Sequence, residues 1–256
     1  MELLSTGVLW IAGSILISLA GLWVIRKVVP CEVMEGHKEM AGFIYGILGT
    51  IFAVILGFSV VVLWEQIRDA AVIADREASQ ISDLHRLAQG LPANQTRAFA
   101  ESLKKYCKVV VDEEWPLMNR GELSPKAHDQ LLEIWRESRG LDARTEFEKI
   151  VLGKIVDTLA NLDDARRGRL LAARSSLPRP LWFALITGAV MTIGFSYLFG
   201  VKNVIAHTVI TVLLAASIGL GLFLIVALDG PFSGGLSISP EAFTAVLENW
   251  DRSSNP

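Results

Sequence analysis

The segment Gly46–Asp69 reads "GILGTIFAVILGFSVVVLWEQIRD" and changes character along its length. It carries glycine at positions 46, 49 and 57 and has no charged residue before Glu65. No proline or turn signal separates its apolar part from its charged part. The pattern therefore predicts one helix that begins in a membrane and continues into water. We expect an all-α membrane protein.

The composition also indicates a membrane protein. The 256 residues are 52% hydrophobic with a mean hydropathy of +0.43, too high for an ordinary soluble domain of this length. The net charge of -3 provides no basic surface for nucleic acid, so we expect no nucleic-acid partner. The start, "MELLSTG", lacks the basic region of a cleaved signal peptide. Four segments are long enough to span a bilayer: Gly7–Ile25, Ala41–Trp64, Leu181–Phe199 and Val204–Leu228.

The organisation that we expect is two membrane hairpins with a helical domain between them. Residues 1–64 form the first transmembrane hairpin, 65–178 a cytoplasmic helical domain, 179–228 the second transmembrane hairpin and 229–256 a C-terminal tail. No β-rich stretch is found along the chain.

Helical patterns fill the predicted domain. The second span continues to Gln89, and "GLP" at 90–92 stops it. A helix over 93–118 follows, in which "WP" at 115–116 bends or ends the helix. Ser124 is a predicted N-cap before Pro125. A last helix starts near Asp142, where Thr145 and Glu148 fit a capping box. Its apolar stripe is Phe147, Val151, Ile155, Thr158, Leu159 and Leu162.

The distribution of basic residues favours a cytoplasmic domain with both termini inside a bacterial inner membrane. The first span taken alone argues for the reverse, because its basic residues follow it. A free thiol at Cys107 suits a reducing compartment. The domain side carries Arg68, Arg76, Arg166, Arg167, Arg169, Arg174 and Arg179, and the opposite side Arg26, Lys27, Lys38 and Lys202.

Small residues recur along one edge of the second span. In lipid, helices associate through close backbone approach at small residues. The third span carries a similar edge that includes Gly188, and the fourth adds Ala215 and Gly219. This predicts a tightly packed bundle assembled between subunits as well as within one, although packing inside a monomer would also use it. The edge of the second span is Gly42, Gly46, Gly49, Ala53 and Gly57.

Beside that edge, Thr50, Val54 and Phe58 recur at steps of four residues. If the small residues pack against neighbouring helices, this stripe faces the axis of a ring, where a hydrophobic constriction can gate by dewetting. As an alternative, Val54 and Phe58 are ordinary packing residues. Glu65 and Arg68 follow at the exit of this helix, where they either set ion preference or mark the water interface.

Several motifs resemble those of bestrophins. "FAVILGF" at 52–58 followed by "WEQ" at 64–66 is similar to the bestrophin pore helix, and "LDGPFSGGLSISPEAF" at 228–243 is similar to the turn that opens the bestrophin tail. We assign Asp229, Pro231 and Phe232 to that turn. Four stretches resemble a bacterial bestrophin-like family, the DUF4239 domain: "AGFIYGILGTIFAVILGF", "VVDEEWP", "LPRPLWFALITGA" and "ALDGPF".

The resemblance implies a homopentamer with a pore lined by the second span and a neck at Thr50, Val54 and Phe58. Thr50 departs from the bulky apolar residue usual in bestrophins, so the neck is wider or wetter there. Ser233, Gly234 and Gly235 stand where a calcium site would need carboxylates, so calcium gating is not implied.

The remaining polar residues indicate neither an enzyme nor a metal centre. The histidines show no pairing on one helix, we expect Cys31 and Cys107 to be free thiols, and we expect no cofactor. "DEE" at 112–114 is typical of a solvated helix face. "RRGR" at 166–169 would touch anionic headgroups or anchor the orientation.

The function that we expect is a passive, homo-oligomeric ion channel, with membrane lipids and permeant ions as partners. Anions are slightly favoured, because animal bestrophins conduct them, although bacterial bestrophins can prefer cations. The alternative is a non-conducting membrane scaffold or signalling accessory whose helical domain binds a partner. A secondary transporter is less favoured, because the chain shows no inverted repeat.

Overall fold

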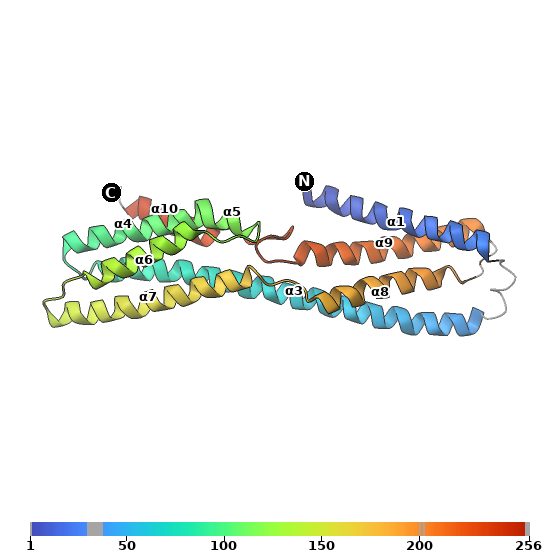
Figure 1. Cartoon of the computed structure of the whole chain (residues 1–256), viewed down its shortest axis with the longest axis horizontal. Helices are drawn as coiled ribbons and strands as arrows, with labels where there is room; N and C mark the ends of the chain where they lie inside the picture. The colour runs from blue at the N-terminus through green and yellow to red at the C-terminus, as the bar shows by residue number, and fades with distance from the viewer. Residues whose placement is uncertain (1, 30–37, 200, 202, 254–256) are drawn as a thin grey trace. The chain divides into compact units, whose positions relative to one another are not determined.

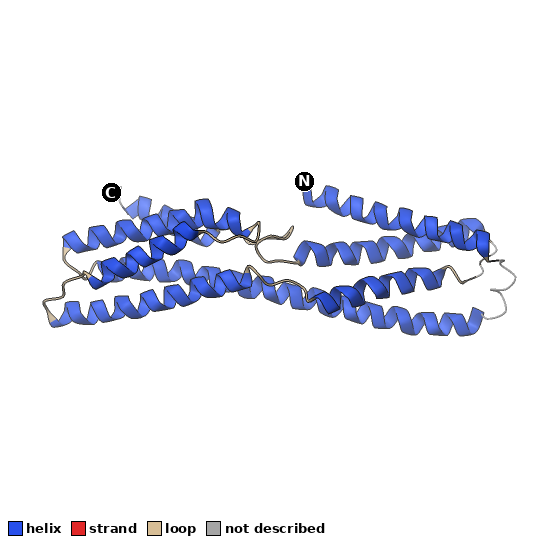
Figure 2. Ribbon diagram, in the orientation of Figure 1, coloured by secondary structure: helices blue, strands red, loops and turns tan. Residues whose placement is uncertain are grey.

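The protein is described by a computed structural model covering residues 2–29, 38–199, 201 and 203–253. These residues are helical, with turns and no strand (Figure 2). Their contacts divide the chain into a membrane unit, residues 1–64 and 176–229, and a helical unit, residues 65–175 and 230–256. Each unit is described by itself below.

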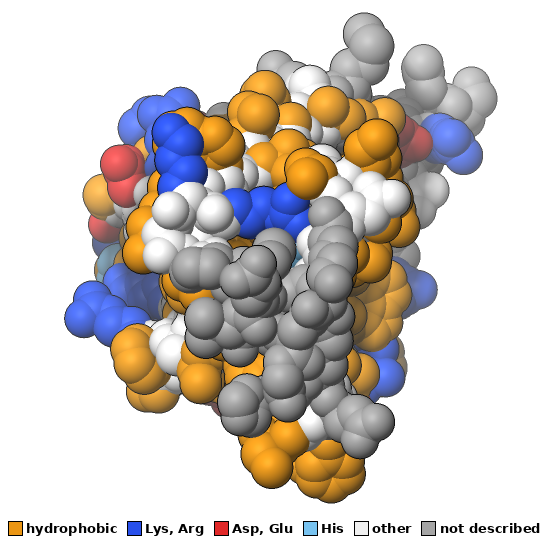
Figure 3. Space-filling view, turned by 90° about the vertical axis from the view of Figure 1, so that its right-hand side faces the viewer, with side chains coloured by type: hydrophobic (Ala, Val, Ile, Leu, Met, Phe, Trp, Pro, Cys, Tyr) orange, Lys and Arg blue, Asp and Glu red, His pale blue; other side chains and the backbone are white. Residues whose placement is uncertain are grey.

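The membrane unit consists of helices that are long and apolar enough to cross a bilayer, as predicted from the sequence (Figure 1). Hydrophobic side chains occupy much of the face in Figure 3, with lysine and arginine side chains between them. The helices are α1 (Glu2–Val28), the first part of α3 (Lys38–Ala88), α8 (Arg179–Ser196) and α9 (Val204–Leu228).

Small residues bring α1 and α9 together. A Cβ atom at Gly219 of α9 would collide with the side chain of Ser14 on α1. The Ser14 hydroxyl donates a hydrogen bond to the Ala215 carbonyl on α9, at 3.0 Å. Close backbone approach of this kind is how helices associate in lipid. Ala215 and Gly219 thus pack against α1 of the same chain, as small residues in a membrane bundle are expected to do.

The helical unit is built around the remainder of α3. The predicted continuation of the second span is confirmed, because α3 runs without interruption to Ala88. Ser124 caps α6 and accepts a hydrogen bond from the Ala127 amide, as predicted. The other elements are α4 (Ala93–Val109), the π-helical turn η1 (Val110–Glu114), α5 (Trp115–Met118), α6 (Pro125–Arg139), α7 (Glu146–Ala172) and α10 (Glu241–Ser253).

The structure corrects the predicted start of the last domain helix. The capping box between Thr145 and Glu148 is present, and it makes Thr145 the N-cap, so α7 begins at Glu146 rather than near Asp142. Phe147 was placed on the apolar stripe but is 65% exposed, because it lies in the first turn, before the stripe reaches the core at Val151.

Trp115 and Pro116 do not end the helix that contains them. The Trp115 amide bonds to the Val110 carbonyl, five residues back, and this wider turn accommodates the missing donor and the ring of Pro116. The chain then continues as α5. Helix α10, which no sequence pattern had indicated, contributes Phe243, Val246 and Trp250 to the core of the helical unit.

Candidate functional site

One side of α3 packs within the membrane unit. Phe52, Ser59 and Leu63 are buried, and the Phe52 ring lies against Gly188 of α8. The Leu56 side chain lies against Gly221 of α9 in the same manner. Large side chains of α3 therefore fit against glycines of its neighbours, and the bundle inside one chain uses this side of the helix.

The predicted neck residues lie on the opposite side of α3. Val54 is 50% exposed and Phe58 is 69% exposed, and Thr50 is exposed as well. The Thr50 hydroxyl donates to the Gly46 carbonyl, one turn back, at 2.8 Å. Its polarity is thus partly satisfied within the helix. The three side chains form one exposed stripe on a helix whose other side is packed.

The small-residue edge of α3 lies next to this stripe, and its glycines have no described atom closer than 4.0 Å to an added Cβ atom. A Cβ atom added at Gly46, Gly49 or Gly57 would meet no described atom within 4 Å. At Gly42 the nearest atom belongs to the Phe199 ring, 4.0 Å away. Ala53 is exposed. This edge does not serve packing among the described residues of one subunit, in contrast to Gly188, Gly219 and Gly221.

The predicted exit residues are on the part of α3 that belongs to the helical unit. Glu65 and Arg68 are both exposed. The Arg68 guanidinium lies 3.7 Å from the Asp69 carboxylate, and both side chains are about two-thirds exposed. A surface pair of this kind contributes little stability, so these groups remain available to ions in solution.

The residues of the predicted tail turn belong to different units: Asp229 to the membrane unit, and Pro231 and Phe232 to the helical unit. In the membrane unit, the Asp229 carboxylate accepts a hydrogen bond from the Leu177 amide at 2.7 Å and from the Trp182 indole at 3.3 Å. Asp229 thereby ties the end of α9 to the start of α8. In the helical unit, Pro231 and Phe232 are buried, and the Phe232 ring packs edge-on against Trp115 with centroids 5.4 Å apart.

Comparison with known proteins identifies the family. The family model described as "Bestrophin-like domain" matches residues 12–243. The chain belongs to the bestrophin-like family. A comparison with curated proteins finds no match. The assignment to the narrower DUF4239 group stays a prediction.

Solved structures share the bestrophin-like fold. A bacterial bestrophin homologue from Klebsiella pneumoniae, solved by Zn-SAD phasing, is 15% identical with a TM-score of 0.66, and the match covers 94% of this chain and 96% of that chain. A single-residue variant of a Klebsiella pneumoniae homologue is 14% identical with a TM-score of 0.70, covering 100% of this chain and 99% of that chain. At these identities the likeness establishes the fold.

The bestrophin-like chain also holds a buried ionic network that sequence reasoning missed. Arg169 of α7 is fully buried, and its Nε and Nη2 atoms donate to the Glu77 carboxylate of α3 at 2.6 and 3.0 Å. Nη2 also donates to Glu114 at 2.6 Å. Arg166 donates to the other oxygen of Glu114 at 2.5 Å, and the Tyr106 hydroxyl donates to Glu77 at 2.7 Å. Two carboxylates and two guanidinium groups thus balance their charges inside the helical unit.

This network corrects two interpretations of the sequence. Glu114 was assigned to a solvated face and Arg166 and Arg169 to headgroups or an orientation anchor, but all three are buried. The spacing of these residues could have indicated their burial. Arg166 follows the buried Leu162 by four residues, and Glu77 lies between Ala74 and Ile81 on the buried side of α3. Removing Arg166 and Arg169 from the basic count also weakens the argument for the predicted orientation.

Burial and charge shift the pKa values around this network. Burial raises the pKa of Tyr106 well above its usual value, and the Glu77 carboxylate raises it further. Burial lowers the pKa of Arg169, but Glu77 and Glu114 raise it more, so Arg169 remains charged. Burial and Glu77 together raise the pKa of the Cys107 thiol to about 12. Cys107 is a free, buried thiol, and Cys31 lies outside the described residues.

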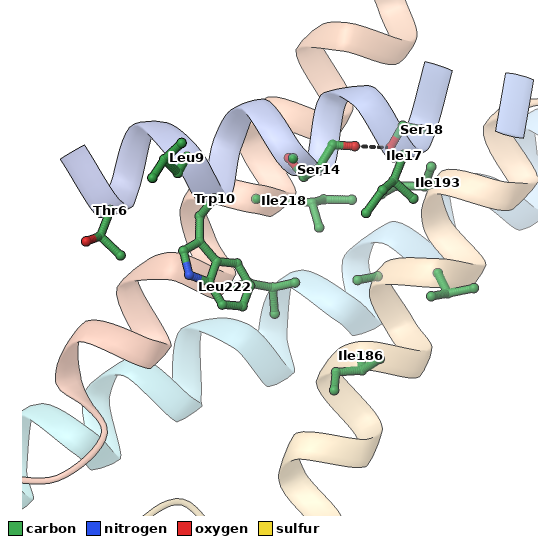
Figure 4. A pocket seen from close by; sticks show the side chains of 14 residues that line it. Thr6, Leu9, Trp10, Ser14, Ile17, Ser18, Ile186, Ile193, Ile218 and Leu222 are labelled. Carbon is green, nitrogen blue, oxygen red and sulfur yellow. Dashed lines mark hydrogen bonds between the residues drawn. The ribbon is translucent and has the colours of Figure 1, made fainter. Parts of the chain in front are cut away.

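The membrane unit contains an apolar cavity of about 560 Å³, lined by α1, α8 and α9 (Figure 4). The Ser18 hydroxyl at its wall donates to the Ser14 carbonyl, and the Ser14 hydroxyl to Ala215. These donors are therefore engaged within the protein, and the cavity presents hydrocarbon to an occupant. Such a lining is unsuited to an ion, which would lose its hydration without replacement.

Within the described part of the chain, no group of three or more histidine, cysteine, aspartate or glutamate side chains is placed to hold a metal ion. The exposed side of α3 carries the apolar stripe, the glycine edge and the solvated charges of Glu65 and Arg68.

Proposed function

We propose that this bestrophin-like protein is a passive ion channel formed by a homo-oligomer, a pentamer, with α3 of each subunit lining the pore. One observation carries the proposal: the two sides of α3 differ. One side packs against α8 and α9, whereas the side with Val54 and Phe58 is left exposed by its own chain. Family membership supports the same reading.

The glycine edge supports the assembly part of the proposal. Gly46, Gly49 and Gly57 have room for a neighbour at backbone distance, and in lipid such edges favour helix association. A second copy of α3 supplies a neighbour of matching length and polarity. Symmetrical contacts along this edge turn the adjoining stripe toward a common axis.

In this proposal Thr50, Val54 and Phe58 form the neck. Val54 and Phe58 present only hydrocarbon, so a narrow ring of them is a barrier that gates by wetting and dewetting. Thr50 adds a hydroxyl and makes one end of the neck wetter. Glu65 and Arg68 lie at the exit and tune ion preference. We propose anions as the favoured ions, on the resemblance to animal bestrophins.

We place the protein in a bacterial inner membrane as a multi-pass protein with its helical unit in the cytoplasm. Support comes from the four apolar helices and from exposed basic residues such as Arg76 and Arg174 of the helical unit. Fusions of a periplasmic phosphatase to residue 122, in the loop before α6, test the orientation. An active phosphatase there contradicts it.

The test of conduction uses purified protein in planar bilayers. We expect discrete currents, and we expect Phe58→Ala to raise the unit conductance or the open probability. Phe183→Ala is the matched control, since Phe183 is also exposed but belongs to α8 and not to the proposed pore helix α3. Folded oligomers that stay silent, both as wild type and as Phe58→Ala, contradict the channel and favour the scaffold alternative.

The subunit number is tested separately by native mass measurement in detergent. The proposal expects a mass of about five times the 28.0 kDa of one chain. A monomer or dimer under conditions that preserve the fold overturns the ring.

A further inference from the structure

The apolar cavity of the membrane unit lies between α1 and α8. Both helices pack on α9 and approach each other less closely, which leaves a space of about 560 Å³. Ile17 of α1 and Val190 of α8 line this space and are 76% and 65% exposed. Figure 4 shows the Trp10 ring reaching from α1 toward Leu222 of α9. The cavity of one subunit therefore opens sideways, toward the lipid chains of a bilayer.

The width of the cavity suits a hydrocarbon chain and excludes a helix. Its lining on α1 runs from Thr6 to Ser18, which is about 18 Å at the rise of an α-helix. Over that length, 560 Å³ corresponds to a channel about 6 Å across. An α-helix with its side chains measures about 10–12 Å across. A helix of a neighbouring subunit thus does not fit inside, whereas one acyl chain does.

The volume and the lining of the cavity also fit one acyl chain. An apolar cavity of about 150 Å³ holds one benzene molecule, so 560 Å³ at the same filling has room for about twenty carbon atoms. This is the size of a single chain of a membrane phospholipid. The Ser14 and Ser18 hydroxyls already donate to backbone carbonyls, so they require no polar group from an occupant.

Arg179 places a positive charge on the face of α8 that carries the cavity lining. Ile186 and Ile193 of α8 line the cavity, and they are seven residues apart on one side of the helix. Another seven residues back, on the same side, is Arg179, the first residue of α8. Arg179 is exposed and has no ion-pair partner among the described residues. Its guanidinium is therefore available to an anion.

The distance between Arg179 and the cavity matches the length of a lipid. From Ile193 to Arg179 the helix rises about 21 Å. Half of a bilayer, headgroups included, is about 20–22 Å thick. A lipid whose chain ends beside Ile193 thus has its phosphate at the level of Arg179. Arginine forms strong, charge-assisted hydrogen bonds with phosphate, and basic groups at this level attract anionic lipids.

We propose that the cavity binds one anionic phospholipid per subunit. One acyl chain lies between α1 and α8, and the phosphate contacts the Arg179 guanidinium. The second acyl chain remains in the surrounding bilayer. The site belongs to the membrane unit alone, and its occupancy can be measured whether or not the protein conducts ions.

The experiment is photocrosslinking of the full chain in phosphatidylcholine vesicles. The probe is a trace of phosphatidylglycerol with a diazirine at the end of one acyl chain, and mass spectrometry of peptides locates the crosslinks. The competitors are unlabelled phosphatidylglycerol and diacylglycerol, which lacks the phosphate. Leu213 of α9 reports contact with unbound lipid, because it is 63% exposed and lies outside the cavity lining.

We expect crosslinks at the deep end of the cavity, at Ser18 or Ile193. An excess of unlabelled phosphatidylglycerol should suppress them at least tenfold more than it suppresses crosslinks at Leu213. The same excess of diacylglycerol should suppress crosslinks at the three positions equally, because it has no phosphate for Arg179 to hold.

Two variants separate the phosphate contact from the chain contact. Arg179→Gln should lower crosslinking in the cavity by about tenfold, through the loss of a charge-assisted hydrogen bond. Its control is Arg144→Gln, at an exposed pair of the helical unit. Gly13→Leu should abolish crosslinking, because position 13 lines the cavity and no described atom lies within 4 Å of a Cβ atom there. Its control is Ala12→Leu, at an exposed position of α1 outside the lining.

Three results would overturn the proposal. The first is crosslinking at Ser18 and Ile193 that competes no better than crosslinking at Leu213. The second is unchanged crosslinking in folded Arg179→Gln, or equal competition by diacylglycerol, either of which would leave an apolar crevice without a phosphate site. The third is a loss of the oligomer in Gly13→Leu with no crosslinks in the wild type, which would show that a neighbouring subunit covers the cavity.

Discussion

The ring of Phe52 on α3 lies against the backbone of Gly188 on α8, so close that a Cβ atom at position 188 would stand 2.6 Å from the ring. This contact fixes which side of α3 faces its own chain. Because Phe52 points inward, Val54 and Phe58, two and six residues further along the helix, lie on the outward side. The proposed pore depends on that orientation.

Gly188→Val tests the contact. The added side chain must displace Phe52, and overpacking of this kind typically costs about 1–3 kcal/mol. We expect a lower melting temperature for the detergent-solubilised protein. Gly194→Val is the matched control on α8, because no atom of the described residues lies within 4 Å of a Cβ atom at position 194. Equal melting temperatures for the two variants would show that Phe52 does not pack there.

Gly57→Leu tests the outward edge. No described atom lies within 4 Å of a Cβ atom at this position, so we expect the subunit to keep its helical circular dichroism, while a bulky side chain prevents close approach of a second copy. Native mass measurement should show a loss of the oligomer. An unchanged oligomer would remove the glycine edge from the interface, whereas loss of helicity would show an unrecognised role inside the subunit.

Arg169→Met tests the buried network. Removing one partner leaves the buried carboxylates of Glu77 and Glu114 short of positive charge, which typically costs about 3–5 kcal/mol. Chemical denaturation should report a loss of this size. Arg136→Met removes an exposed pair with Glu133 and should change the free energy of unfolding by less than about 0.5 kcal/mol. Comparable losses in the two variants would contradict a network that is buried.

Cys107 yields a prediction on thiol reactivity and pH. Its pKa is raised to about 12 in the folded protein, from about 8.5 in an unfolded chain. The protonated thiol therefore stabilises the fold fully below about pH 8.5, and this contribution is lost as the pH rises toward 12. In a Cys31→Ser background, iodoacetamide at pH 8 should label the unfolded protein and spare the native one. Rapid labelling of the native protein would show that Cys107 is accessible.

Asp229 yields a prediction on the end of the last membrane helix. Its two carboxylate oxygens accept from the Leu177 amide and the Trp182 indole. Asp229→Ala leaves both donors without this acceptor and should cost about 1–3 kcal/mol. Trp182→Phe removes only the longer bond and should cost less, as measured by thermal unfolding. A larger loss of stability in Trp182→Phe than in Asp229→Ala would contradict this, and would show that the indole contributes more than the Asp229 carboxylate.

The sequence predicted those parts of the fold that depend on local pattern. The length of α3, the Ser124 cap and the Thr145 capping box follow from hydrophobic periodicity and from residues a few positions apart. The family followed from motifs such as the apolar run at 52–58. In each of these cases the information lies within one helix or one turn.

The buried network could not be predicted in the same way, because its pairing joins residues far apart in the chain. Glu77 and Arg169 are 92 positions apart, and Glu114 reaches them through the unexpected π-helical turn. Charged residues are almost never fully buried without a partner, so a single sequence favours solvent for each of them. Only the packing of α3, α7 and η1 shows that the charges meet.

Cysteine modification shows directly whether the exposed side of α3 lines a water-filled path. In a Cys31→Ser background, Val54→Cys and Leu213→Cys are each reconstituted in planar bilayers and treated with an anionic methanethiosulfonate reagent. Both native side chains are exposed in one subunit, at 50% and 63%, but only Val54 faces the proposed pore. We expect an irreversible change of current for Val54→Cys and none for Leu213→Cys. An unreactive Val54→Cys in a conducting channel, or equal modification of both, would contradict it.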